Sequence, residues 1–271
     1  MLLDFKHFFE SLASKDVQKL VIFGNFHQTD LDAISRSEQD ETLTHAISQM
    51  ASETSLKLEH FSGTFLIEAC PFFSSRKPFW EWNNLQSIIL SSQLLAPESD
   101  LTDVKDLLED AAAAAMRMPR LNTMEIWNGR KELASLFQYQ SCRGQTNATL
   151  TWRSTWELSM PNPVIRAWEA VAKKHGARGL NVSREFLDIR ENLESHGDAI
   201  HYLRLSAPVI RPVSLQQICM EHDIQNTWRE RREDWRGTFL REMASLADPD
   251  DRGHQEALAY LRASFGRREV D

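Results

Sequence analysis

A short strand-like phrase recurs along this chain roughly every 25 to 36 residues, a spacing typical of repeat architectures. The phrases are KLVIFGNF from Lys19, SLKLEHF from Ser55, NLQSIILSS from Asn84, RLNTMEIWN from Arg120 and NATLTWRSTW from Asn147. One such strand with its return segment cannot bury an apolar face alone, so neighbouring copies must stack. The recurrence therefore predicts an α/β fold, a leucine-rich-repeat-like solenoid with parallel strands and return helices.

Apolar residues alternate with other residues inside each phrase, which assigns them to the two faces of a sheet. One row is apolar from phrase to phrase, as stacked parallel strands over a core require. Its members are Leu20, Ile22, Leu56, Leu58, Ile88, Leu90, Met124, Ile126, Leu150 and Trp152. We expect the opposite row to line one shared, exposed surface of the sheet. That row consists of Phe23, Lys57, Glu59, Ser91, Glu125, Trp127, Thr151 and Arg153.

Helical segments separate the phrases. Apolar residues at spacings of three and four predict helices over 3–15, 40–53, 100–118 and 162–176. The alanine run inside the third of these suits a helix that lies close to a sheet. The stretch 70–84 contains two prolines and five aromatic residues without periodicity. It is therefore predicted to be a loop, and an aromatic loop of this kind needs a cover or a ligand.

The pattern changes after residue 156. We expect a helix over 181–197, an extended segment near 202–205, and a helical tail from about residue 214. The chain, 1–271, is interpreted as a single domain. It has repeat-like strands and helices over 1–160 and a mainly helical C-terminal extension over 161–271, with one further strand near 202–205.

Composition restricts the class of protein. The chain has 271 residues, 42% of them hydrophobic, and a net charge of −8 with acidic and basic residues interspersed. These values indicate a globular protein and argue against nucleic acid as a partner.

No long apolar run predicts a membrane span, and the first residues contain no signal-peptide cleavage site. Cys70, Cys142 and Cys219 have no metal-binding spacing and indicate a reducing compartment. We expect a soluble protein, cytoplasmic or nuclear, and choose the cytoplasm.

The densest polar cluster is SHGDAIH, residues 195–201. Its two histidines can supply an acid and a base, because imidazole titrates near neutral pH. The alternative is structural, with His196 and Asp198 capping adjoining elements around Gly197. The spacing does not match a helical HExxH, and the chain contains no GxSxG, GxGxxG or GxxxxGK[ST]. We therefore expect no metal and no cofactor.

Tryptophan is abundant, with eight residues in the chain. A tryptophan offers a broad apolar face and one N–H donor, which suits a pocket that holds an apolar guest in one pose. Core packing is the other explanation, because Trp168 lies on a helical stripe. Five tryptophans surround the predicted sheet, namely Trp80, Trp82, Trp127, Trp152 and Trp156.

Four phrases carry a family resemblance: RLNTMEIWNGR (120–130), ATLTWRSTWEL (148–158), VIRAWEAVAKKHGARGL (164–180) and SHGDAIHYLRLSAPVIRPVSLQQI (195–218). Over this region the chain resembles the C-terminal domain of unknown function of fungal F-box-like proteins, and the part before it resembles a leucine-rich repeat. The resemblance implies a repeat domain that receives a target protein. An F-box would dock a ubiquitin-ligase adaptor, but the helix expected at 3–15 is too short to be one. We therefore expect a chain without an F-box.

Two functions of different classes follow. The first is a non-catalytic recognition module that binds a ligand or a protein through the strand face. The second is a cofactor-independent enzyme of fungal secondary metabolism, a pericyclic cyclase of the Diels–Alder type. Such an enzyme acts on an apolar terpenoid or polyketide, because holding the reacting groups at attack distance needs no nucleophile, metal or cofactor.

The candidate residues are of two kinds, polar and aromatic. The polar candidates for catalysis are Glu125, His196 and His201, and the candidates for substrate binding are Phe23, Trp80, Trp82, Trp127, Trp152 and Trp156. An exposed aromatic patch would favour a protein partner. A patch roofed by the C-terminal helices would favour an apolar small molecule. The substrate, the partner and the oligomeric state cannot be read from the sequence.

Overall fold

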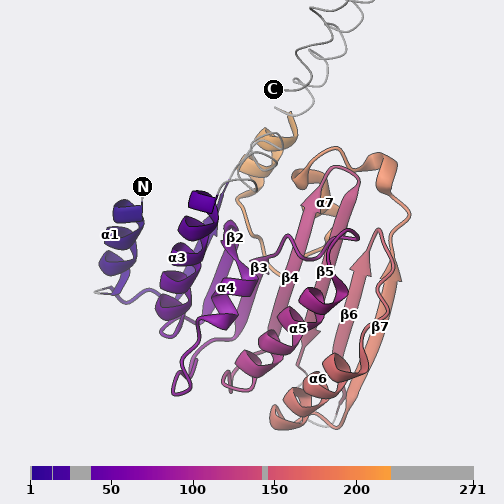
Figure 1. Cartoon of the computed structure of the whole chain (residues 1–271), viewed down its shortest axis with the longest axis horizontal. Helices are drawn as coiled ribbons and strands as arrows, with labels where there is room; N and C mark the ends of the chain where they lie inside the picture. Colours follow the sequence, from indigo (N-terminus) through magenta and orange to yellow (C-terminus); the bar gives the residue numbers. More distant parts are fainter. Residues whose placement is uncertain (1, 14, 25–37, 142–145, 221–271) are drawn as a thin grey trace, which may run out of the picture. The chain divides into compact units, whose positions relative to one another are not determined.

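The computed structural model describes residues 2–13, 15–24, 38–141 and 146–220 of the chain. The chain divides after Gln216 into two units. The helices and strands labelled in Figure 1 lie in the first unit, Met1–Gln216. The helices expected in the tail beyond residue 220 lie outside the described residues.

The described residues form a seven-stranded sheet, in which strands that are neighbours in sequence are also neighbours in space. All pairs are parallel except those that β5 makes with β4 and β6, which are antiparallel. The strands are β1 (Lys19–Phe23), β2 (His60–Glu68), β3 (Ser87–Ser91), β4 (Thr123–Arg130), β5 (Leu133–Gln140), β6 (Ala148–Ser154) and β7 (Leu180–Phe186). The mixed α/β class predicted from the sequence is confirmed.

Helices cover one face of this sheet (Figure 1). They are α3 (Glu38–Ser55), α4 (Ala69–Ser74), α5 (Leu101–Ala115) and α6 (Asn162–Lys174), and α1 (Leu2–Ala13) packs beside α3. Their apolar side chains join the apolar row of the strands, including Ile88, Met124 and Leu150, in the larger hydrophobic core. The four helices predicted before residue 176 are thus confirmed, with ends shifted by a few residues.

Local sequence explains where two of these helices begin and end. The Asp100 side chain caps α5 by accepting a hydrogen bond from the Thr102 N–H at 2.7 Å. Four of the five alanines, Ala111, Ala112, Ala114 and Ala115, are buried in the larger core, as expected for a smooth helix face. Just beyond α6, Gly176 has a φ of 82°, a left-handed conformation that glycine adopts at helix ends without steric cost.

A smaller core lies on the other face of the sheet. It is built around α7 (His196–Leu203), which begins with a capping box between Ser195 and Asp198. The buried members of this core are Ile89, Trp127, Ala134, Leu136, Leu193, Ala199, Leu203 and Val209. The helix lies so close to β4 that a Cβ on Gly129 would stand 2.4 Å from the Cβ of Ala199. The segment 187–210 therefore covers part of this face.

This cover overturns the expectation of an exposed strand surface. Glu125 and Trp127 have no exposed surface, and Ser91 and Thr151 are also buried. Two other members of the expected row, Lys57 and Glu59, lie outside any strand, because the backbone turns at the end of α3 and β2 starts only at His60. Leu56 and Leu58 precede β2 for the same reason, although Leu58 is still part of the core.

After residue 130 one strand was not predicted, and two predictions are wrong. β5 was not expected, and its reversed direction interrupts the parallel stack. Residues 181–197 are not one helix, since β7 and a short 3-10 turn, Arg190–Asn192, occupy them. There is no strand near 202–205, because α7 continues through Leu203 and Arg204 ends it with a φ of 52°. β7 pairs along its whole length with β6. Backbone hydrogen bonding to β6 therefore makes this segment a strand, although the spacing of its apolar residues is typical of a helix.

The aromatic stretch 70–84 is a loop from residue 75 onward, as predicted, after its first residues complete α4. No helix within the described residues has both the length and the apolarity needed to cross a membrane.

Candidate binding site

The predicted site residues fall on opposite faces of the sheet. Phe23, Glu125, Trp127 and His196 lie on the face covered by α7. Trp80, Trp82, Trp152 and Trp156 belong to the core on the other face. His201 is exposed on α7, with its ring 5.3 Å from that of Tyr202. The sheet therefore separates the residues into two groups that share no common cavity.

On the α7 face the structure brings three predicted residues together around Phe65. The ring of Phe65 lies 5.6 Å from Phe23, 5.2 Å from Trp127 and 5.3 Å from His196. Phe65 was not a candidate, because it reaches this position through an irregularity in β2, with a φ of 62°, that the sequence does not reveal. The cluster is closely packed, and we interpret it as part of the smaller core.

Glu125 fastens the covering segment to the sheet. Its carboxylate accepts hydrogen bonds from the side-chain amide of Gln138 at 2.5 Å and from the backbone N–H of Ser206 at 2.9 and 3.1 Å. Burial raises the pKa of Glu125, and the hydrogen bonds oppose that rise. The Glu125 carboxylate is thus hydrogen-bonded to groups of the protein itself. Its role here is structural, since it joins the covering segment to the sheet.

Trp152 and Trp156 are packing residues. Their rings meet edge to face, 5.2 Å apart, and both are almost fully buried. The indole N–H of Trp156 donates to the Ser135 hydroxyl at 2.7 Å, and that of Trp152 donates to the Trp156 carbonyl at 3.4 Å. With their polar groups satisfied inside the core, these tryptophans fit the core-packing explanation.

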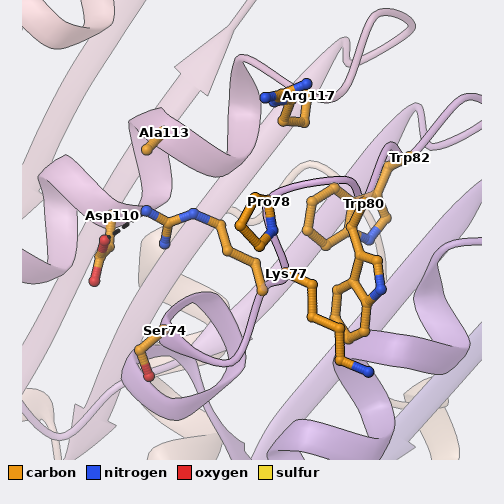
Figure 2. Close-up of a pocket in the computed structure, with 9 residues that line it drawn as sticks. Ser74, Lys77, Pro78, Trp80, Trp82, Asp110, Ala113 and Arg117 are labelled. Atoms are coloured by element: carbon orange, nitrogen blue, oxygen red, sulfur yellow. Dashed lines mark hydrogen bonds and ion pairs between the residues drawn. The ribbon is translucent and has the colours of Figure 1, made fainter.

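The loop that carries Trp80 and Trp82 borders an open groove of about 460 Å³ (Figure 2), a size found in many ligand pockets. The groove runs between this loop and one side of α5. It is lined by Ser74, Arg76, Lys77, Pro78, Trp80, Trp82, Asp110, Ala113 and Arg117. Two of the predicted binding residues are thus at a cavity, and the others in this lining were not predicted.

Hydrogen bonds hold the groove loop in place. A turn closes with the Trp80 N–H donating to the Lys77 carbonyl at 3.0 Å, and Pro78 follows Lys77 at a position that favours proline. The indole N–H of Trp82 donates to the Ser55 hydroxyl at 2.7 Å. The backbone N–H of Trp82 donates to the Arg117 carbonyl at 2.9 Å, which ties the loop to the segment after α5. The two sides of the groove are therefore fixed relative to each other.

Charged side chains surround this groove. The guanidinium of Arg76 pairs with the Asp110 carboxylate at 2.9 Å and also donates to the Phe73 carbonyl at 2.8 Å. Arg117 lies 3.5 Å from the carboxylate of Glu81, longer than a good charged hydrogen bond. The ammonium of Lys77 lies over the Trp80 ring, 5.3 Å from its centre. The site thus combines fixed aromatic residues with partly exposed cations.

Comparison with known proteins places the chain in a family. The sequence model of a family of unknown function, DUF6546, matches residues 11–211. The chain belongs to that family. The match includes all seven strands, α7 and the groove, so the DUF6546 region contains every site described here. No curated protein and no solved structure matches the chain.

The groove of this DUF6546 protein has a weak signal in the sequence. Arg76 and Lys77 directly precede the proline and tryptophans of the loop, which places basic and aromatic residues together. Asp110 and Arg117 are 34 and 41 residues beyond Arg76, so their approach to it depends on the packing of α4 against α5. Among the described residues, no three His, Cys, Asp or Glu side chains are grouped in a way that could hold a metal ion.

Proposed function

We propose that this protein is a recognition module that binds a segment of a partner protein in the groove between loop 75–82 and α5. The observation that carries the proposal is the loop itself. It is fixed by hydrogen bonds to Ser55 and Arg117 yet presents the exposed side chains of Lys77 and Pro78 to the open groove. A binding surface held in place before the partner arrives loses less conformational freedom on binding.

The resemblance of residues 120–218 to fungal F-box-like proteins adds to this proposal, since such a domain is expected to receive a target. The parallel order of β1 to β4, with α3, α4 and α5 on one face, is compatible with a leucine-rich-repeat-like origin of this half. We also propose a cytoplasmic location, in line with a Cys70 thiol that forms no disulfide with any described residue.

The cyclase hypothesis receives less support from the geometry. It requires Trp127, Trp152 and Trp156 to act as walls of one cavity. Trp127 lies in the core beneath α7, whereas Trp152 and Trp156 pack on the opposite face of the sheet. We therefore propose binding rather than cyclisation.

A peptide selection tests the proposal. Random dodecapeptides displayed on phage are selected on the wild-type protein and then tested on A113W, in which a bulky side chain fills the groove from the exposed Ala113 position on α5. A170W is the matched control, because Ala170 is an exposed position on α6 that does not line the groove. We expect selected peptides to bind the wild type and A170W but not A113W. Peptides that bind all three proteins equally would refute the groove as the recognition site.

A further inference from the structure

We infer that the groove takes an acidic segment of its partner, with an Asp or Glu carboxylate entering between Lys77 and Arg117. This inference rests on the proposed recognition function and adds the chemical class of the bound segment. It concerns the open part of the groove, where Figure 2 shows Arg117 and Lys77 on different sides of Pro78.

The charges around the groove favour an anion. Three cations, Arg76, Lys77 and Arg117, meet two carboxylates, Asp110 and Glu81. Among the described residues, no carboxylate lies within ion-pair distance of Lys77. The groove thus carries one positive charge in excess on a chain whose net charge is −8. A carboxylate from the partner would complete the pairing.

Arg117 is available for such a contact. Its side chain is 48% exposed, and it lies 3.5 Å from Glu81. That pair is expected to be weak, because an exposed ion pair contributes little in water. A second carboxylate can therefore approach Arg117 without breaking a strong internal bond.

Asp110 acts as an internal competitor for the incoming anion. Its carboxylate already holds the Arg76 guanidinium at 2.9 Å, and it lines the same groove. It therefore attracts Arg76 away from a bound carboxylate and also repels that carboxylate directly. Replacing Asp110 by a neutral residue of the same shape should strengthen binding, an effect opposite to that expected if Asp110 only stabilised the groove.

The apolar part of the groove indicates which kind of residue lies next to the Asp or Glu of the bound segment. Pro78 is exposed and lines the groove together with Trp80, so an apolar residue next to the Asp or Glu can pack on its ring. Nucleic acid fits less well, because Asp110 and Glu81 would repel a continuous row of phosphates. The structure thus points to a peptide with an isolated acidic residue and an apolar neighbour.

The test uses the groove-dependent peptides from the selection, labelled with fluorescein and titrated with the full-length protein. We expect these peptides to be enriched in Asp or Glu, and replacement of the acid by Asn or Gln to weaken binding at least threefold. Raising the NaCl concentration from 50 to 500 mM should weaken binding as well, since salt screens exposed charges. Groove-dependent peptides without acidic residues would overturn this inference while leaving the recognition function intact. Failure to obtain any groove-dependent peptide would instead contradict the recognition function itself.

Substitutions in the protein provide the second readout. D110N should bind the acidic peptides about two- to fivefold more tightly, the range expected for one exposed charge pair. K77Q should weaken binding by a similar factor. The matched controls are D106N, on the exposed side of α5, and K173Q, on α6, because neither residue lines the groove. Unchanged or weaker binding by a folded D110N protein would contradict the competition between Asp110 and the ligand.

Discussion

Glu68, at the end of β2, should make the stability of this protein fall as the pH rises. One carboxylate oxygen, Oε1, is shut off from solvent and has no hydrogen-bond partner among the described residues. The other, Oε2, accepts a hydrogen bond from the Gln93 N–H at 3.3 Å. Burial raises the pKa of Glu68 from 4.5 to about 7, although hydrogen bonds from Ser92 and nearby backbone N–H groups oppose the rise.

The sign of the effect follows from proton binding. The folded protein binds the Glu68 proton more tightly than the unfolded chain does, so this group favours folding most below pH 4.5. The contribution decreases as the pH rises through about 7. A pKa change of this size corresponds to about 3 kcal/mol in all, of which about 2 kcal/mol is lost between pH 5 and pH 8.

The substitution E68Q keeps the shape of the side chain and removes its titration. Urea unfolding at pH 5, 6, 7 and 8 should show the stability of E68Q rising by about 2 kcal/mol relative to the wild type across this range. E157Q is the control, because Glu157 is exposed on the surface. If the difference in unfolding free energy between E68Q and the wild type stays constant with pH, folding does not raise the pKa of Glu68 and the prediction is wrong.

Two other predictions concern the packing on each face of the sheet. G129A should destabilise the fold by about 1–3 kcal/mol, because the added Cβ would collide with Ala199 on α7. The double variant G129A/A199G should recover part of that loss in thermal unfolding, and no recovery would show that the collision is not the cause. W156F should lose about 1 kcal/mol, since it removes the N–H that donates to Ser135. An unfolding midpoint for W156F equal to that of the wild type would contradict this role for the hydrogen bond.

Local signals in the sequence predicted much of the helical layer and part of the sheet. Asp100 before an apolar helical pattern and Gly176 after another mark real helix ends. The alternation in KLVIF and in TMEIW places Leu20 and Ile126 on the core side of their strands. These features depend on neighbours within a few residues, and such neighbours are visible in the sequence.

Long-range contacts account for most of what the sequence did not predict. Glu125 alternates with apolar residues as an exposed residue would, yet it is buried because the backbone of Ser206, 81 positions later, lies against it. β7 lies at the edge of the sheet and leaves Val182 and Phe186 exposed. Its apolar residues therefore need not follow the pattern of a buried strand, and their spacing resembles that of a helix. Neither effect has a signal within the segment concerned.

The candidate site was predicted only in part for the same reason. Trp80 and Trp82 were expected to bind a ligand because the loop is aromatic and contains proline, and both residues line the groove. Asp110 was not expected there, because its pairing with Arg76 joins α5 to the loop across 34 residues. The remaining aromatic candidates were assigned to one surface, whereas the sheet divides them between two cores.

Hydrogen–deuterium exchange of the full-length protein, with and without a saturating acidic peptide from the selection, tests the central claim most directly. If the groove is the recognition site, the peptide should slow exchange in two segments, 75–82 and 110–117, which form its two sides. Exchange in α7 should not change, because that helix lies on the other face of the sheet. Slower exchange in α7 with no change in those two segments would contradict the groove as the recognition site.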